Sequence, residues 1–237
     1  LPARSGLGTS SAFAVGMLNA FHYCRGEYVN KRQLADEAIR LEREICNEAG
    51  GLQDQIAVAF GGMNKILFSG NDYKVCPVMI SQERKVLLKK RLMLFFTGFS
   101  RLSFKIQEKT RNRIGSRIET LLEIKRLVDE AERILTDDKT NLDDFGRLLD
   151  YGWRLKREIN QEISTDEVDI LYERAKKAGA LGGKLLGAGG GGFLLLYVTP
   201  ERWKEVQQAL AGLMHVPFQF ENSGTEMIYY APDYDTG

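Results

Sequence analysis

The spacing of apolar residues predicts most of the helices in this 237-residue chain. Phe13, Met17 and Phe21 recur every four residues, the spacing of neighbours on one face of a helix. Helices are predicted over residues 10–23, 31–48, 112–136, 141–163, 166–179 and 200–213, and the three between 112 and 179 have charged residues on the face opposite the apolar one. Gly50 and Gly51 end the second of these, where a left-handed C-terminal residue is favoured.

Short apolar runs predict the strands. Residues 65–68 and 73–80 flank the turn sequence Ser69-Gly70-Asn71-Asp72, which is typical of a β-hairpin. The continuous apolar run at 92–97 is short enough for a buried strand, and a charged stretch precedes it. Further strands are expected at residues 193–198, 216–220 and 226–231. We place a domain boundary near residue 85, which gives domains over 1–84 and 85–237, and expect an α+β second half.

Composition and charge exclude several classes of protein. Lys and Arg number 33 and Asp and Glu 32, so the net charge of +1 offers no one-signed field for nucleic acid or an anionic membrane. No run approaches the roughly 18 apolar residues of a membrane span. Cys24, Cys46 and Cys76 form no CxxC pair, which favours reduced thiols and a cytoplasmic location. A homo-oligomer stays an open alternative.

The chain opens with a glycine-rich segment, Pro2 to Ala12, that runs into the first predicted helix. Glycines let successive backbone N–H groups converge on a phosphate, and a helix N-terminus adds unpaired donors. The lysine of a Walker loop is absent, and Ser11 replaces the third glycine of GxGxxG. The alternative is a tight turn before a helix capped by Thr9, Ser10 or Ser11. Because Leu1 rather than Met precedes this motif so closely, we expect a missing N-terminal segment.

Three segments carry a family resemblance. PxxxGLGxSSA at residues 2–12 resembles the ATP-binding motif of the GHMP kinases, the superfamily of galactokinase, homoserine kinase and mevalonate kinase. Residues 51–55, GLQDQ, resemble its aspartate-bearing segment, and residues 183–193, GKLLGAGGGGF, resemble its C-terminal glycine motif. Since all three occur in the family's order, the chain is identified as a member of this superfamily.

Finer features resemble one branch, the D-glycero-D-manno-heptose 7-phosphate kinases. They are residues 96–101, the Ala178-Gly179-Ala180 segment that leads into the glycine motif, and Trp153 with Lys156. The resemblance implies an α+β fold in the two-domain GHMP kinase architecture. Its N-terminal domain would be ribosomal-S5-like, here without its first strands, and its C-terminal domain ferredoxin-like.

The resemblance also implies a site for ATP and Mg²⁺. ATP would contact Gly6, Leu7, Gly8, Thr9, Ser10 and Ser11. Phosphoryl transfer needs a divalent cation, and Ser10 aligns with the family's magnesium-binding serine. Glu42 lies a suitable distance before the aspartate and flanks the apolar stripe of its helix, whereas Arg43 points away from it. Glu44 is the alternative ligand, and a solvated surface glutamate is the simpler reading of Glu42.

Asp54 is the candidate catalytic residue, because a carboxylate there can orient a sugar hydroxyl and accept its proton. The alternative is an N-cap for a helix from Gln55. Arg101, with Lys105 after it, could grip the non-transferred phosphate of a sugar phosphate, although both could be solvated charges. His22 and His215 lack metal-ligand spacing and are expected to be structural.

Gly189 and Gly190 lie in a loop with few side chains, where the backbone could approach a substrate or simply make a tight turn. The function implied is transfer of the γ-phosphoryl group of ATP to a sugar hydroxyl, the anomeric hydroxyl for a heptose 7-phosphate kinase. A kinase for a fucose- or galactose-like sugar, or a non-catalytic nucleotide and sugar sensor, are the alternatives.

Overall fold

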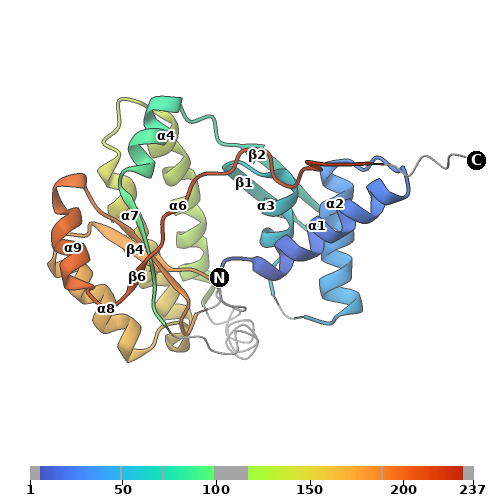
Figure 1. Ribbon diagram of the computed structural model, residues 1–237. Coiled ribbons are helices and arrows are strands. Elements are labelled where there is room, and N and C mark those ends of the chain that lie inside the picture. Colours follow the sequence, from blue (N-terminus) through green and yellow to red (C-terminus); the bar gives the residue numbers. More distant parts are fainter. Residues whose placement is uncertain (1–5, 49, 71, 99–116, 188, 232–237) are drawn as a thin grey trace, which may run out of the picture. The chain divides into compact units, whose positions relative to one another are not determined.

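The computed structural model describes residues 6–48, 50–70, 72–98, 117–187 and 189–231 (Figure 1). The chain divides into two compact units. Unit 1 comprises Leu1–Leu7 and Val78–Phe220, and unit 2 comprises Gly8–Pro77 and Glu221–Gly237. The end of the chain thus rejoins the unit that contains the first long helix. The domain boundary expected near residue 85 stays a prediction.

Unit 2 is built from helices and a hairpin, and it follows the predicted order. Its elements are α1 (Thr9–Cys24), α2 (Lys31–Arg40), a π-helical turn η1 (Leu41–Ile45), α3 (Gln53–Phe60), β1 (Asn64–Ser69) and β2 (Asp72–Pro77). The two strands pair antiparallel, with Ser69 opposite Asp72, which confirms the hairpin. Asn30 caps α2 by accepting a hydrogen bond from the backbone N–H of Gln33.

The core of unit 2 lies among α1, α2, α3 and the hairpin. It contains Val15, Leu34, Ala35, Ala38, Ile56, Ala59 and Tyr73. Leu34 and Ala38 confirm the predicted apolar face of α2. The face predicted for α1 is wrong, because Phe13 and Phe21 are 71% and 57% exposed. The smaller side chains of Ala14 and Val15 are buried instead, and they allow close packing of helices.

Unit 1 combines helices with an antiparallel sheet of strand order β4-β5-β3-β6. Its elements are α4 (Gln82–Lys89), β3 (Leu92–Phe96), α6 (Ile118–Thr136), α7 (Asp143–Ile159), a 3₁₀ turn (Gln161–Ile163), α8 (Asp166–Lys177), β4 (Gly182–Leu185), β5 (Phe193–Tyr197), a 3₁₀ turn (Pro200–Arg202), α9 (Trp203–Ala209) and β6 (Met214–His215). Strand β5 lies between β4 and β3, with Leu195 opposite both Lys184 and Leu94.

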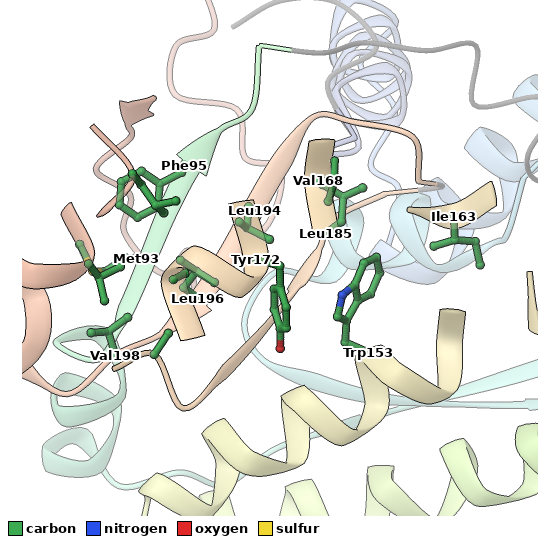
Figure 2. Packing of buried hydrophobic residues seen from close by; sticks show 14 residues of the cluster. Met93, Phe95, Trp153, Ile163, Val168, Tyr172, Leu185, Leu194, Leu196 and Val198 are labelled. Carbon is green, nitrogen blue, oxygen red and sulfur yellow. The ribbon is translucent and has the colours of Figure 1, made fainter. Parts of the chain in front are cut away.

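The sheet and the helices of unit 1 enclose one apolar cluster (Figure 2). Leu194 and Leu196 from β5 are fully buried with Met93 and Phe95 from β3. Trp153 of α7 lies with its ring near Tyr172 of α8 at a centroid distance of 6.4 Å. Burial of aromatic and branched side chains on both sides of the sheet accounts for the predicted continuous apolar runs at β3 and β5.

Helix α4 and strand β4 of unit 1 are absent from the sequence-based prediction. Helix α4 lies in the charged stretch, where Ser81 caps it and buried Arg84 donates to the carbonyl oxygens of Ile134 and Thr140. Strand β4 contains glycines for which side chains leave no room. A Cβ on Gly182 would collide with the carbonyl oxygen of Gly146, so the helix and strand backbones pack directly together.

The strands expected at 216–220 and 226–231 are wrong. The ladder ends where Val216 donates its backbone N–H to Leu94 O at 2.8 Å, and Pro217 next in the chain has no N–H to continue it. Residues 226–231 are mostly apolar, but their side chains are not packed into a core, since Ile228 is 95% and Tyr229 78% exposed. Among the residues described, no helix is long and apolar enough to cross a membrane.

Candidate functional site

The first helix begins at a glycine that faces the candidate catalytic residue. Gly8 is the N-cap of α1 in the left-handed conformation (φ 67°), so the expected cap by Thr9, Ser10 or Ser11 is wrong. A Cβ on Gly8 would lie 3.4 Å from Cγ of Asp54, an ordinary van der Waals contact, so the two residues are neighbours and it is the left-handed φ that favours glycine here. The first turn of α1 contains no acidic residue of its own, so Asp54 of α3 is the carboxyl group placed beside this N-terminus.

Glu42 is a buried carboxylate at the centre of unit 2. It is 5% exposed and its Oε2 accepts a hydrogen bond from Ser11 Oγ at 3.0 Å and another from Gln55 Nε2. Its Oε1 is buried and has no hydrogen-bond partner among the described residues. A buried carboxylate oxygen without a donor is costly, so the site has an unused acceptor.

The π-helical turn η1 places Glu42 and its neighbour Arg43 together. Cys46 N–H bonds to Leu41 O at 2.9 Å, an i to i+5 bond that inserts one extra residue into the turn. Arg43, which the helical wheel directs away, instead donates from its guanidinium to Glu48 O and Gly51 O at 2.9 and 2.7 Å. Glu44 is exposed beside Arg40, so the alternative to Glu42 is not drawn into the site.

Asp54 lies in the first turn of α3 and is solvent-exposed. The N-cap of α3 is Leu52, so Asp54 does not have the capping role considered from sequence. Crowding by surrounding protein raises the pKa of the Asp54 carboxyl, and the negative charge of Glu42 raises it further, while Arg43 opposes both effects. The Asp54 carboxyl therefore binds its proton more tightly than an ordinary surface aspartate does.

The oxygen-bearing side chains near the start of α1 in unit 2 are chemically suited to binding Mg²⁺. Mg²⁺ prefers hard oxygen ligands and keeps several waters, and Glu42 offers a buried carboxylate oxygen that no described donor uses. Ser10, the expected partner, is exposed at the start of α1, and it is Ser11 that bonds to Glu42. No cluster of three His, Cys, Asp or Glu side chains that could hold a metal ion lies among the described residues.

The glycine loop lies in unit 1 and packs against several backbone segments. Gly190 N–H donates to Ile163 O at 2.9 Å, so this amide is already engaged. Gly189, at φ 112°, would bring a Cβ to 2.6 Å from the same carbonyl oxygen. Gly192 exchanges hydrogen bonds with Thr97 at 2.9 to 3.1 Å. Tight backbone packing thus fixes the shape of this loop.

Gly6 of the opening motif also belongs to unit 1 and lies against the same loop. A Cβ on Gly6 would come 2.9 Å from Leu186 O, and one on Gly187 would come 2.7 Å from the Gly6 Cα. Both residues have positive φ angles near 80°. Two of the three motifs therefore meet through glycine backbones. Arg101 and Lys105 lie outside the described residues.

Two lysines beside this loop escaped site prediction. Lys156 of α7 donates from Nζ to Gly187 O at 3.2 Å. Burial and then the charge of Lys184 lower the pKa of Lys156 to about 8, and burial lowers the pKa of Lys184. Both lysines stood in the sequence only as parts of a resemblance, Lys156 with Trp153 and Lys184 within the glycine motif of residues 183–193, and no local pattern distinguishes either from a surface residue.

Comparison with known proteins decides the family. The model for the GHMP kinases N-terminal domain matches residues 1–62, and the model for the GHMP kinases C-terminal domain matches residues 132–215. The two matches together span more than half of the chain and contain all three motifs. The chain belongs to the GHMP kinase family. This confirms the resemblance inferred from the motifs and the expected α+β fold class.

Several relatives refine the comparison. The D-glycero-alpha-D-manno-heptose 7-phosphate kinase of Campylobacter jejuni is 33% identical over 214 residues, covering 89% of this chain and 62% of that protein. The bifunctional fucokinase/GDP-fucose pyrophosphorylase of Arabidopsis thaliana is 32% identical over 219 residues, covering 89% of this chain and 20% of that protein. This GHMP kinase chain thus spans less than two thirds of either relative.

A solved structure supports the same fold. The crystal structure of a D-glycero-D-manno-heptose 1-phosphate kinase from Bacteroides thetaiotaomicron aligns with a TM-score of 0.76 at 30% identity. The alignment covers 98% of this chain and 66% of that one. The architecture of this chain is therefore that of the GHMP kinases.

Proposed function

We propose that this protein is an ATP-dependent sugar kinase that transfers the γ-phosphoryl group to the anomeric hydroxyl of D-glycero-D-manno-heptose 7-phosphate. Membership in the GHMP kinases and the similarity to a heptose 7-phosphate kinase support this choice of reaction. The observation that carries it is the arrangement in unit 2. There the start of α1, the buried carboxylate of Glu42 and the tuned carboxyl of Asp54 lie together.

The start of the chain would hold the triphosphate. Backbone N–H groups at the N-terminus of α1 have no intrahelical partners, and the helix dipole places partial positive charge there. We assign nucleotide binding to the segment Gly6, Leu7, Gly8, Thr9, Ser10 and Ser11. Glycines at 6 and 8 take left-handed φ angles, which turn the chain without a side chain in the way.

Glu42 and Ser10 would hold Mg²⁺, which when bound neutralises charge on the β- and γ-phosphate oxygens. Ser11 and Gln55 would hold the Glu42 carboxylate in place by donating to Oε2, which leaves Oε1 for the ion or for a water bound to it.

Asp54 would orient the acceptor hydroxyl and take its proton. The hydroxyl oxygen forms the new bond to the γ-phosphorus, the bond from that phosphorus to the β-γ bridging oxygen breaks, and the proton passes to an Asp54 carboxylate oxygen. A pKa raised by crowding and by Glu42 makes this carboxylate a better proton acceptor than an ordinary surface aspartate. We assign the acceptor sugar phosphate to Arg101, Gly189 and Gly190, with Gly190 contributing loop shape, since its amide is engaged.

A second acceptor class has support in the comparison. The Arabidopsis relative, whose name includes fucokinase, is almost as similar as the Campylobacter protein, so a fucose-like sugar is the alternative acceptor. The free cysteines Cys24, Cys46 and Cys76 fit a reducing compartment, and we propose a cytoplasmic location.

The test is direct detection of product. The protein is incubated with ATP, Mg²⁺ and, separately, heptose 7-phosphate, fucose or galactose, and phosphorus NMR follows the products. The proposal predicts a new anomeric phosphate with heptose 7-phosphate and stoichiometric release of ADP. A product only with fucose or galactose would replace the acceptor, and nucleotide binding without any product would replace the kinase by a sensor.

A further inference from the structure

Lys156 and Lys184 are neighbouring cations at one edge of unit 1. Lys156 belongs to α7 and Lys184 to β4, two elements that pack directly on each other. The ammonium of Lys156 lies 3.2 Å from Gly187 O, at the start of the glycine loop. The charge of Lys184 acts on Lys156, so the two ammonium groups share one electrostatic environment.

The surroundings of these two ammonium groups differ from those of a neighbouring lysine. Among the described residues, no Asp or Glu oxygen forms an ion pair with Lys156 or Lys184. Lys176 on the neighbouring helix α8 shows the usual arrangement, because its Nζ donates to Leu181 O at 2.8 Å and pairs with Asp150 at 3.2 Å. A half-buried charge without a partner costs free energy, and two like charges cost more.

The pKa values of the two lysines reflect this cost. Burial lowers the pKa of both, and mutual repulsion contributes for Lys156, whose pKa is about 8. Within the part of the chain that the structure describes, Lys156 uses one of its three donors, on Gly187 O, and the Lys184 ammonium forms no hydrogen bond or ion pair. Perturbed pKa values cluster at functional sites, and two unpaired cations beside a glycine loop suit an anionic ligand.

We propose that Lys156 and Lys184 form a binding site for a phosphate monoester beside the glycine loop of Gly187 and Gly189–Gly192. A dianionic phosphate group would neutralise both ammonium groups and accept hydrogen bonds from both. The inference rests on the proposed kinase function only for the source of the phosphate. That source is either the nucleotide or the non-transferred phosphate of the sugar acceptor.

The experiment compares ligands with and without phosphate. Isothermal calorimetry measures the affinities of ADP and adenosine, and of heptose 7-phosphate and the unphosphorylated heptose, for wild type, Lys156→Met and Lys184→Met. Lys204→Met, an exposed lysine on α9, is the matched charge control.

We expect each site variant to lose about tenfold or more in affinity for one phosphorylated ligand, while its unphosphorylated counterpart is unaffected. Loss for ADP assigns the site to the nucleotide, and loss for heptose 7-phosphate assigns it to the acceptor. Folded variants that bind all four ligands like wild type would overturn the proposal.

A second measurement needs no substitution. Acetic anhydride labels lysines of the wild-type protein with and without saturating phosphorylated ligand, and peptide mapping reads each position. Lys156 and Lys184 should be protected by the ligand and Lys204 should not, and equal labelling with and without ligand would refute the site. Because neither measurement depends on catalysis, absence of turnover would remove the kinase assignment while leaving the phosphate site standing.

Discussion

Ser11 Oγ donates a hydrogen bond of 3.0 Å to Oε2 of Glu42, and both residues are buried. The bond connects the first turn of α1 to the π-helical turn η1, 31 residues later in the chain. This bond joins the segment assigned to the nucleotide to the carboxylate assigned to the metal. The serine hydroxyls at 10 and 11 thus have different tasks, since Ser10 is exposed.

Stability should separate these two serines. Ser11→Ala removes a donor to a buried carboxylate and should lower the free energy of unfolding by about 1–3 kcal/mol. Ser10→Ala, on the exposed side of the same turn, should stay within about 0.5 kcal/mol of wild type. Urea unfolding measures both. Equal stabilities of the two variants would mean that the Ser11–Glu42 bond contributes nothing.

Arg43 should set the acid limb of the pH profile. Its positive charge lowers the pKa of Asp54 against the effects of crowding and of Glu42. In Arg43→Met the Asp54 pKa should therefore rise, and the acid limb of kcat/KM should move to higher pH. Arg40→Met is the control, because Arg40 ends α2 directly before η1 but faces exposed Glu44. An acid limb that stays at its wild-type pH in Arg43→Met would separate Arg43 from Asp54.

Alanine substitutions at Gly189 and Gly212 should distinguish the cost of an unfavourable φ from the cost of a steric clash. Both have φ angles above 100°, but a Cβ on Gly212 meets no atom within 4 Å, whereas one on Gly189 meets Ile163 O at 2.6 Å. Gly212→Ala should cost roughly 1 kcal/mol of unfolding free energy for its unfavourable φ. Gly189→Ala should cost about 1–3 kcal/mol more because backbone must move. Similar losses in the two variants would show that the loop yields freely.

The contributions of the two histidines to the free energy of unfolding should change with pH in opposite directions. His22 bonds to Glu37 and Glu27, which raises its pKa above 6.5, while burial and then Lys89 lower the pKa of His215. The contribution of His22 is complete below pH 6.5 and is lost as pH rises through its folded-state pKa. That of His215 is complete above pH 6.5 and is lost as pH falls through its lowered pKa.

Urea unfolding of His22→Gln and His215→Gln between pH 5 and 9 checks both signs. The difference between wild type and His22→Gln should shrink toward high pH, and that for His215→Gln should shrink toward low pH. Differences that do not vary with pH would contradict the assigned shifts.

The sequence predicts elements with strong periodicity better than it predicts their faces. Helix α1 was expected from Phe13, Met17 and Phe21, yet the buried side carries Ala14 and Val15, because periodicity marks an apolar face without saying that other elements cover it. Strand β4 was missed because Gly182 and Gly183 lack side chains to show a pattern. Glycine is needed at these two positions because the backbone packs closely against Gly146 and Leu195, and only the tertiary structure reveals these contacts.

The site shows the same limit at the level of single residues. Glu42 was expected to flank the apolar face of its helix, and it is buried as a candidate ligand would be. The π-helical turn that brings Arg43 to the loop of Gly51 has no sequence signature here, because it depends on bonds made across the turn. Assignment of roles to Asp54, Glu42 and Ser10 stays a prediction.

The turnover of Asp54→Asn tests the account most directly. Asparagine keeps the shape of the side chain but cannot accept the hydroxyl proton, so kcat for phosphorylation of the sugar should fall by about 10²- to 10⁴-fold. The free energy of unfolding at pH 7 should be unchanged or higher, because a carboxyl whose pKa is raised in the folded state destabilises the fold once ionised. A folded Asp54→Asn protein with turnover within a few-fold of wild type would contradict the proposed role of Asp54.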